Sequence, residues 1–290
     1  MRFFRTAFTF GEDGAMEGFA DKVAAVTGAG SGIGRALAVE LARSGARLAI
    51  SDVDVQGLAE TERFLHKIGA EVRADRIDVT QRAEFLAYAD TVKEHFGRVN
   101  QIYNIAGIAF VGDIEVSQFK DIERVMDVDY WGVVNGTKAF LPHLIASGDG
   151  HVINMSSMFG LFGVPGQAAY NSAKFAVRGF TEALRQEMAL AGHPVAVTVV
   201  HPGYVKTAIA RNAGAAEGID KEAGIKVFNR VAITSARRAA RTILKAVHRK
   251  KARVLVGLDA RAFDLLVRVS PTGYQRILGP MTARFQSSSR

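Results

Sequence analysis

The sequence contains no cysteine among its 290 residues. This absence excludes disulfides, cysteine zinc sites and thiol catalysis, and it gives no sign of an oxidising compartment. Long apolar runs are also missing. The longest segment without Asp, Glu, Lys or Arg, which includes residues 151–173, carries too many polar side chains for the roughly 20-residue apolar span of a membrane helix. The N-terminus, MRFFRTAFTF, lacks the apolar core and cleavage site of a signal peptide. We therefore expect a cytoplasmic protein.

Acidic residues are scarce at the C-terminal end. Residues 237–290 carry 13 Lys and Arg residues and only two acids, Asp259 and Asp264, so this segment has a formal charge of +11 whereas the rest of the chain has −3. A basic tail can attract nucleic acid or anionic lipid, but such runs are more often a solvated helix face and a flexible end. We favour the second interpretation. We expect no nucleic-acid partner, and contact of the tail with a membrane surface is the less favoured alternative.

Short apolar runs alternate with segments of helical spacing along most of the chain. The strand-like runs are residues 22–27, 47–51, 71–77, 99–105, 151–156, 195–200 and 253–256. The helix-like segments are residues 33–44, 55–68, 82–96, 119–145, 167–190 and 235–249. Strands separated by helices form βαβ units with right-handed crossovers. The predicted fold is therefore α/β, a Rossmann-type doubly wound parallel sheet with helices on both faces, in a single domain.

A glycine-rich loop, TGAGSGIG at residues 27–34, stands between the first strand and the first helix. Glycines there allow a sharp turn and let the backbone approach a pyrophosphate, while the helix N-terminus offers N–H groups to the phosphates. This context predicts a dinucleotide site. Asp52 follows the second strand, 18 residues after Gly34, at about the distance expected for an acid that binds the ribose hydroxyls of NAD. The alternative is that Asp52 caps the next helix, for which Asp54 is an equally good candidate.

Beyond this loop, the sequence closely resembles the short-chain dehydrogenase/reductase family over residues 22–256. The resemblance rests on the TGxxxGxG loop, on Ser157 followed by Tyr170-x-x-x-Lys174, and on three further segments in the family's order. These are Asp78-Val79, Asn104-Ile105-Ala106-Gly107, and Pro202-Gly203 with Val205 and Thr207. It implies a strand order of 3-2-1-4-5-6-7, a small-molecule substrate, and a homodimer or homotetramer.

The family resemblance also implies which residues bind the cofactor. This set is Gly28, Ser31, Gly32, Ile33, Gly34, Asp52, Asp78, Val79, Asn104, Ala106, Gly107, Tyr170, Lys174, Pro202, Gly203, Val205 and Thr207. The cofactor is expected to be NAD rather than NADP, because the Asp52 carboxylate would repel a 2′-phosphate. No metal is expected. In one position the chain departs from the family, since Asp129 stands where an Asn usually helps to hold a water that relays protons to the lysine.

The chemistry follows from three residue types. A free tyrosine titrates near pH ~10, and a neighbouring ammonium favours its phenolate. Tyr170 and Lys174 share a helix face, so Tyr170 can take the proton of an alcohol while a hydride leaves its carbon. Ser157 can hydrogen-bond the substrate oxygen. We count Asp129 with these catalytic residues, although its effect is open, because its charge could raise the pKa of Lys174.

The predicted activity is an NAD-dependent hydride transfer between the nicotinamide and a secondary alcohol or ketone. Residues 158–165, with Tyr204, Ile209 and Phe228, are apolar and aromatic, which suggests a lipophilic substrate. The alternative for this segment is that its two phenylalanines are core residues. For the activity, the alternatives are an NADPH-dependent ketone or 3-oxoacyl reductase and a non-catalytic dinucleotide sensor.

The chain is thus divided into a loose N-terminal extension, residues 1–20, a dinucleotide-binding catalytic domain, residues 21–257, and a basic helical tail, residues 258–290. Residues 207–235 interrupt the alternation, as a lid over the site or a surface loop with a short helix would. In the tail, Phe263, Leu266 and Val267 have helical spacing. We expect them to form a subunit or core contact rather than an interfacial amphipathic helix.

Overall fold

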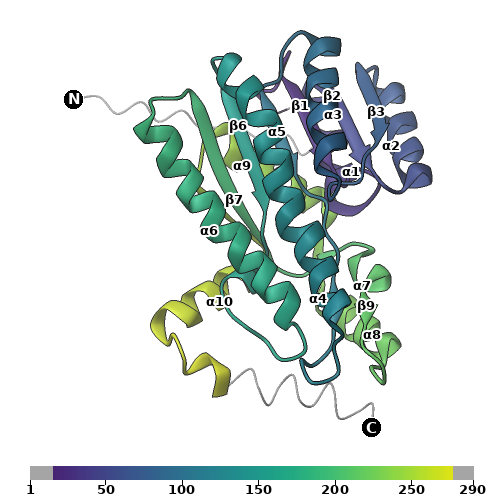
Figure 1. Cartoon of the computed structure of the whole chain (residues 1–290), viewed down its shortest axis with the longest axis vertical. Coiled ribbons are helices and arrows are strands. Elements are labelled where there is room, and N and C mark those ends of the chain that lie inside the picture. Colours follow the sequence, from purple (N-terminus) through teal and green to yellow (C-terminus); the bar gives the residue numbers. More distant parts are fainter. Residues whose placement is uncertain (1–15, 277–290) are drawn as a thin grey trace.

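The computed structural model describes residues 16–276 (Figure 1). The central strands are β1 (Val23–Thr27), β2 (Arg47–Asp52), β3 (Val72–Arg76), β4 (Gln101–Asn104), β6 (Gly150–Met155), β7 (Val195–Pro202) and β11 (Arg253–Val256). The main helices are α1 (Gly32–Arg43), α2 (Val55–Ile68), α3 (Arg82–Phe96), α4 (Phe119–Met126), α5 (Gly132–Ala146), α6 (Ala168–Leu190), α8 (Lys221–Val231), α9 (Ala236–His248) and α10 (Leu258–Val269).

The central sheet has seven strands in the order β11-β7-β6-β4-β1-β2-β3. All of its pairs are parallel, and β1 lies between β2 and β4, with Val26 opposite Ile50 on one side and Tyr103 on the other. Counting only these strands along the chain, the order is 3-2-1-4-5-6-7, which confirms the prediction. The strand order reverses beside β1, so a crevice is expected at the carboxyl ends of β1 and β4, where such folds bind ligands.

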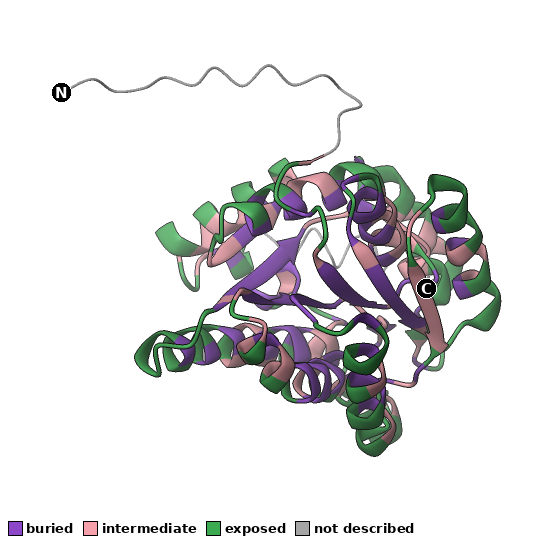
Figure 2. Cartoon of the chain, turned by 90° about the horizontal axis from the view of Figure 1, so that it is seen from above, coloured by how far each residue is buried: buried purple, intermediate pink, exposed green. Residues whose placement is uncertain are grey.

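Helices cover both faces of the sheet, which Figure 2 shows as a buried layer between two helical layers. Side chains alternate along β1 with the period of two that a strand imposes. Ala24 and Val26 belong to a core cluster with residues of α1, α2 and α9, whereas Val23 and Ala25 belong to one with residues of α3, α5 and α6. The doubly wound arrangement predicted from the alternation is confirmed.

The segment 119–145, predicted as one helix, is interrupted. Between α4 and α5 the residues Asp127–Trp131 form a π-helical turn. Single π turns inside α-helices are rare and often occur at functional sites, because the extra residue re-aims the side chains. Periodicity cannot reveal such a turn, since it shifts the apolar pattern by only one position. The turn contains Asp129.

Residues 207–235, predicted as a lid or as a surface loop with a short helix, contain several short elements. They contain α7 (Ile209–Asn212), β9 (Gly214–Ala215), α8 and β10 (Thr234–Ser235). β9 pairs with β5 (Phe110–Val111), and β10 pairs with β8 (Val205–Lys206). These short ribbons tie the segment to the loops that follow β4 and β7.

Some residues on either side of the predicted catalytic domain pack against it. Of the predicted extension, residues 1–15 lie outside the described residues, but residues 16–20 pack on the domain, with Phe19 only 1% exposed. Part of the tail is also packed, since Tyr274 is buried and joins a cluster with Phe162 and α10. Phe263, Leu266 and Val267 were predicted to form a subunit or core contact. In the structure they pack against the cluster of Phe162, which is a core contact. Residues 277–290 lie outside the described residues.

Candidate active site

The glycine loop follows β1 and depends on glycines at three positions. Gly28 and Gly32 have φ angles of +65° and +53°, in the left-handed region that glycine tolerates. A Cβ at Gly28 would lie 2.8 Å from the backbone of Ala106, and one at Gly34 would lie 2.1 Å from the Gly28 carbonyl oxygen. The loop is therefore pressed against both its own helix and the end of β4, with Ser31 exposed at the helix N-terminus and Ile33 packed inward.

We predict that Gly34→Ala disturbs the loop. The new methyl group would meet the Gly28 carbonyl at 2.1 Å, so the turn must open. Such overpacking costs about 1–3 kcal/mol in the free energy of unfolding, and dinucleotide affinity should fall with it. Gly179→Ala is the matched control, because nothing lies within 4 Å of the position that its Cβ would take and alanine favours a helix. Thermal unfolding and NADH titration measure both effects, and a Gly34→Ala protein that behaves like the control would contradict this interpretation of the loop.

Thr27 fastens the loop to the neighbouring strand. Its hydroxyl oxygen accepts hydrogen bonds from the backbone N–H groups of Ile105 (3.0 Å) and Ala106 (3.1 Å). The segment after β4 is thus held beside the glycine loop, and Gly107 lies next to the Asp129 carboxylate and the Lys174 ammonium. The glycine loop and the Tyr170 region therefore meet at the carboxyl ends of the strands.

The Asp52 carboxylate lies at the end of β2, against the glycine loop. Its Oδ2 accepts a hydrogen bond from the Gly30 N–H at 2.8 Å, and its Oδ1 accepts one from the Asp54 N–H at 2.9 Å. The cap of α2 is Asp54, which accepts from the Gly57 N–H at 3.1 Å. The alternative that Asp52 caps the helix is therefore wrong.

The nearby Arg35 is held by groups of the protein itself. Its guanidinium donates to the carbonyl oxygens of Gly30 and Gly57 and to the Thr61 hydroxyl, and it forms an ion pair of 2.8 Å with Glu60. This cation therefore buttresses the glycine loop.

Tyr170 and Lys174 lie one turn apart on α6, with the Lys174 Nζ 5.4 Å from the centre of the Tyr170 ring. Lys174 is 3% exposed and forms an ion pair of 2.9 Å with Asp129, which is fully buried. Nζ also donates to the Met155 carbonyl at 3.3 Å, and the Asp129 Oδ1 accepts from the Ile108 N–H at 2.7 Å. The π turn thus brings a carboxylate from between α4 and α5 onto the lysine of α6.

The pKa values of Lys174, Asp129 and Tyr170 depend both on burial and on the charges of neighbouring groups. Burial alone would lower the pKa of Lys174, but the Asp129 carboxylate and Tyr170 more than offset this, so that its pKa is raised. Burial also raises the pKa of Asp129, and the Lys174 ammonium opposes this rise. For Tyr170, burial raises the pKa, Lys174 lowers it, Asp129 raises it and a hydrogen bond with Ser157 lowers it, with a rise as the net result. Lys174 alone does not bring the phenol below its ordinary pKa.

Ser157 follows β6 and is buried. Its hydroxyl oxygen accepts from the Phe159 N–H at 3.1 Å, and its carbonyl oxygen lies 2.8 Å from the Nδ1 of His201. Burial lowers the pKa of His201 to about 4, so this ring is neutral at physiological pH and donates to Ser157. Sequence reasoning missed His201, because a lone histidine inside an apolar strand looks like any core residue.

Asn171 is a second residue that sequence reasoning missed. Its side-chain amide donates to the carbonyl oxygens of Phe159 (2.6 Å) and Phe162 (2.8 Å), and its Oδ1 accepts from the Val164 N–H at 3.1 Å. The loop after Ser157 is thereby fixed to α6 beside Tyr170. The sequence feature that could have identified Asn171 is a polar residue at a buried helix position.

Two of the predicted cofactor residues have side chains engaged elsewhere. The Asn104 amide is buried and donates to Asn154 (2.8 Å) and Thr137 (3.2 Å). Through its amide nitrogen this side chain links β4 to β6 inside the sheet. The Asp78 Oδ1 accepts from the N–H and hydroxyl of Thr80. The carbonyl of Val79, another buried residue of the predicted set, accepts from Asn135.

The segment after β7 returns to the glycine loop. A Cβ at Gly32 would lie 3.1 Å from the Thr207 side chain, and Val205 is buried. Pro202 ends β7, and the Gly203 N–H donates to the Val256 carbonyl. The Asp259 carboxylate accepts from the Tyr204 N–H at 2.6 Å and occupies the space that a Gly203 side chain would need. Asp259, at the start of α10, was counted only as a charge in the sequence.

An aromatic wall stands beside Tyr170. The Phe159 ring lies 6.4 Å from Tyr170 and 6.1 Å from Tyr204, which in turn lies 5.8 Å from Phe228. Phe162 is only 2% exposed and packs on Phe263 of α10. Of the two phenylalanines in residues 158–165, Phe162 is therefore a core residue, whereas Phe159 is half-buried next to Tyr170.

Within residues 16–276, no group of three or more His, Cys, Asp or Glu side chains is placed to hold a metal ion. In the same residues, no helix combines the length and apolar character that a bilayer crossing requires.

Comparison with known proteins decides the family. Residues 22–218 match the family model described as short chain dehydrogenase. The chain belongs to this family. It is therefore a short-chain dehydrogenase, an oxidoreductase by family, and the resemblance seen in its motifs is confirmed.

Individual relatives of this short-chain dehydrogenase cover most of its length. SadH of Mycobacterium tuberculosis is 59% identical over 271 residues, which are 93% of this chain and 98% of SadH. Mouse estradiol 17-beta-dehydrogenase 11 is 34% identical over 67% of this chain and 65% of its own. A crystal structure of a short chain dehydrogenase/reductase from Burkholderia phymatum in complex with NAD superposes with a TM-score of 0.82, at 31% identity over 90% of this chain and 96% of that one.

Proposed function

We propose that this protein is an NAD-dependent dehydrogenase that exchanges a hydride between the nicotinamide and a lipophilic secondary alcohol or its ketone. The observation that carries the proposal is the placement of Tyr170 beside a glycine loop built for a dinucleotide, with the Lys174 ammonium 5.4 Å from its ring and the Ser157 hydroxyl near enough to lower its pKa.

The residues at the strand ends fit such a cofactor. The cradle left by Gly28, Gly32 and Gly34 has no room for side chains, and the N-terminus of α1 opens onto it. Asp52 would receive the adenosine ribose, and Lys174 the ribose of the nicotinamide half. When bound, the oxidised nicotinamide accepts a hydride and brings a positive charge.

The protein's own residues handle the proton. We propose that Tyr170 takes the proton of the alcohol and returns it in the reverse direction, while Ser157 hydrogen-bonds the substrate oxygen. Because burial keeps the pKa of Tyr170 above its ordinary value in the free protein, the phenolate needs a positive charge in addition to Lys174. Asp129 would hold Lys174 in place and keep it protonated, which is a positioning role.

Two contacts support NAD over NADP. The Asp52 carboxylate is anchored to the glycine loop by the Gly30 N–H and would repel a 2′-phosphate at the ribose. Arg35, the basic residue that follows the loop, is already bonded to Glu60 and to backbone carbonyls. The NAD complex of the Burkholderia relative supports the same choice.

The aromatic wall supports a lipophilic substrate. Phe159, Tyr204 and Phe228 form a continuous chain of ring contacts that begins at Tyr170. The name of the mouse relative, estradiol 17-beta-dehydrogenase 11, refers to a lipophilic alcohol, which agrees with this choice.

The assembly and the compartment are also proposals. A homodimer or homotetramer is supported by the exposed aromatic side chains on the neighbouring helices α4 and α6, where Phe119 is 83% and Phe175 is 42% exposed. A cytoplasmic location agrees with the absence of cysteine from the sequence.

Side-by-side titration with NADH and NADPH tests the cofactor assignment. We expect wild-type protein to bind NADH more tightly, and Asp52→Ala to lose roughly tenfold or more of this preference because the repulsive carboxylate is gone. Asp54→Ala is the matched control, since it removes the neighbouring acid and costs about 1 kcal/mol of helix capping without touching the ribose site. Tighter binding of NADPH by the wild type would favour a reductase, and binding of neither cofactor would overturn the proposal.

A further inference from the structure

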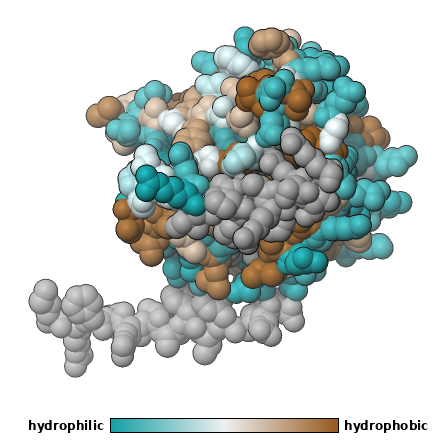
Figure 3. Space-filling model, turned by 90° about the horizontal axis from the view of Figure 1, so that it is seen from below, coloured by the Kyte–Doolittle hydropathy of each residue, from teal (hydrophilic) through white to brown (hydrophobic). Residues whose placement is uncertain are grey.

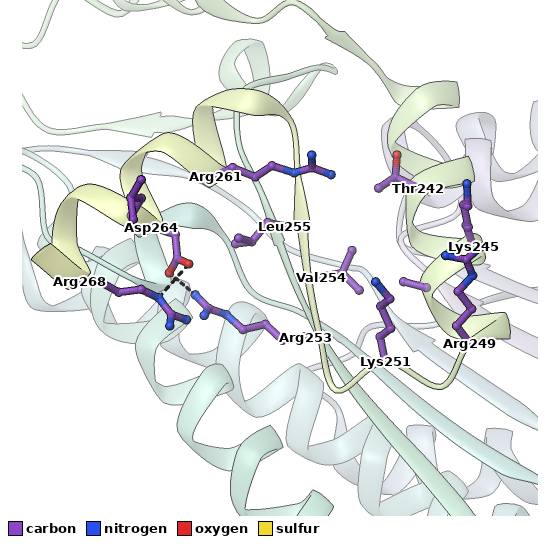
Figure 4. A pocket seen from close by; sticks show the side chains of 12 residues that line it. Thr242, Lys245, Arg249, Lys251, Arg253, Val254, Leu255, Arg261, Asp264 and Arg268 are labelled. Atoms are coloured by element: carbon purple, nitrogen blue, oxygen red, sulfur yellow. Dashed lines mark hydrogen bonds and ion pairs between the residues drawn. The ribbon is translucent and has the colours of Figure 1, made fainter. Parts of the chain in front are cut away.

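A basic groove lies at the β11 edge of the sheet, between α9 and α10 (Figure 4). It has a volume of about 780 Å³, and its lining carries six basic side chains and one acidic side chain. The basic residues are Lys245, Arg249, Lys251, Arg253, Arg261 and Arg268. The acid, Asp264, pairs with Arg253 and with Arg268 (3.0 Å), so it offsets only part of this charge. The groove is distinct from the site at Tyr170, since none of the site residues lines it.

Helix α10, one wall of this groove, carries an apolar stripe on its outer side. Leu258, Leu265 and Val269 are 72%, 64% and 77% exposed. Their spacing of seven and four residues places them on one side of the helix, and Arg261 and Arg268 lie next to that side. α10 lies in the lower part of Figure 1. Figure 3 views the molecule from below and shows apolar patches set among hydrophilic ones. We call the groove and this stripe together the α10 surface.

The inner side of the same helix belongs to the substrate region. Phe263, Leu266 and Val267 pack against the cluster of Phe162, and the Phe162 and Phe263 rings lie 5.1 Å apart. The outer apolar residues are therefore not required for this packing. An apolar stripe bordered by arginines resembles the pattern of helices that lie in a membrane interface, with apolar side chains inserted and cations at the phosphates.

The combination of charge and apolar exposure selects the partner. A second copy bound through a two-fold contact would bring two basic grooves together and repel. A nucleic acid would match the charge but not the exposed leucines and valine. We propose that the α10 surface docks on an anionic phospholipid bilayer, the partner that the sequence alone made the less favoured alternative. The docking would place the aromatic wall one helix away from the lipid, which suits a substrate dissolved in the bilayer. The docking itself does not depend on the proposed function, but this link to the substrate does.

Vesicle co-sedimentation of the full chain tests the docking without substrate or cofactor. Vesicles of phosphatidylcholine alone are compared with vesicles that also contain phosphatidylglycerol, at low and at physiological salt. We expect binding to the anionic vesicles only, and weaker binding as salt rises. Equal binding to both vesicle types, or to neither, would overturn the proposal. So would binding of a DNA fragment in place of vesicles.

Substitutions locate the surface. The triple variant Arg249→Gln, Lys251→Gln, Arg261→Gln should bind anionic vesicles roughly 100-fold more weakly, from about fivefold per basic residue. The triple variant Leu258→Ser, Leu265→Ser, Val269→Ser should lose roughly tenfold or more, because exposed apolar area is removed. The matched control is Arg63→Gln, Lys67→Gln, Lys93→Gln on α2 and α3, which removes the same number of positive charges on helices away from β11. An equal loss in the control, or a loss of self-association in place of vesicle binding, would contradict the assignment. Thermal unfolding measured in parallel shows whether each variant is folded.

Discussion

Tyr170→Phe is expected to lower the turnover number by about 10²–10⁴-fold, the usual contribution of a general acid or base. The variant keeps the ring that packs on Phe159 and Lys174, and loses only the hydroxyl that would exchange a proton with the substrate. NADH affinity should change little, because the proposed cofactor contacts are dominated by the glycine loop and Asp52.

The measurement is steady-state oxidation of secondary alcohols with NAD, together with NADH titration of the same preparation. Tyr130→Phe is a suitable control, because Tyr130 packs near Tyr170 through ring contacts with Trp131 and Phe180 that phenylalanine preserves. If Tyr170→Phe retained turnover within a few-fold of this control, the phenol would not be the proton-transfer group.

Asp129 is expected to give the second large effect. Asp129→Ala leaves the ammonium of Lys174 buried without its carboxylate, a change that typically costs about 3–5 kcal/mol in the free energy of unfolding. Thermal or urea unfolding measures this loss. A cost below about 1 kcal/mol would mean that the ion pair contributes little to the folded state.

Asp129→Asn separates the charge from the shape. The amide oxygen can still accept from the Ile108 N–H, so the π turn should persist. The carboxylate charge raises the pKa of Lys174 and of Tyr170, and its removal should therefore lower the pKa of the phenol. The pH profile of kcat/KM for alcohol oxidation should shift toward lower pH, since the phenolate then forms at lower pH. An unchanged profile would contradict the effect of the Asp129 charge on the phenol, and a shift toward higher pH would mean that Lys174 loses its proton when the carboxylate is removed.

Much of the fold followed from periodicity. The seven strands alternate with long helices, and this alternation predicts a doubly wound parallel sheet, whereas the strand order was expected from the family resemblance. The short ribbons β5–β9 and β8–β10 could not be, because two-residue strands carry no periodic signal. The π turn at Asp127–Trp131 was hidden for a related reason, since α4 and α5 read as one helix.

The candidate site was predictable where residue type and chain position coincide. The glycines of residues 28–34, Asp52, Tyr170 and Lys174 stand at strand and helix ends that a parallel sheet brings to one edge. The partners of these residues were not predictable. Asp129 was noticed as a departure from a motif, but its ion pair with Lys174 depends on the π turn. His201 and Asp259 act on the backbone of Ser157 and Tyr204 from distant strands and helices, and contacts of this kind leave no local pattern.

The most direct test of the proposed function is NADH formation from a panel of secondary alcohols, with NAD and NADP compared for each. The panel should run from polar polyols to long-chain and polycyclic alcohols, and Tyr170→Phe should be measured beside the wild type. We predict that the wild type turns over lipophilic alcohols with NAD and turns over polyols little, and that Tyr170→Phe loses turnover of all the alcohols. A preference for polyols would contradict the role of the aromatic wall, and turnover that survives in Tyr170→Phe would contradict the central claim that this tyrosine exchanges the proton.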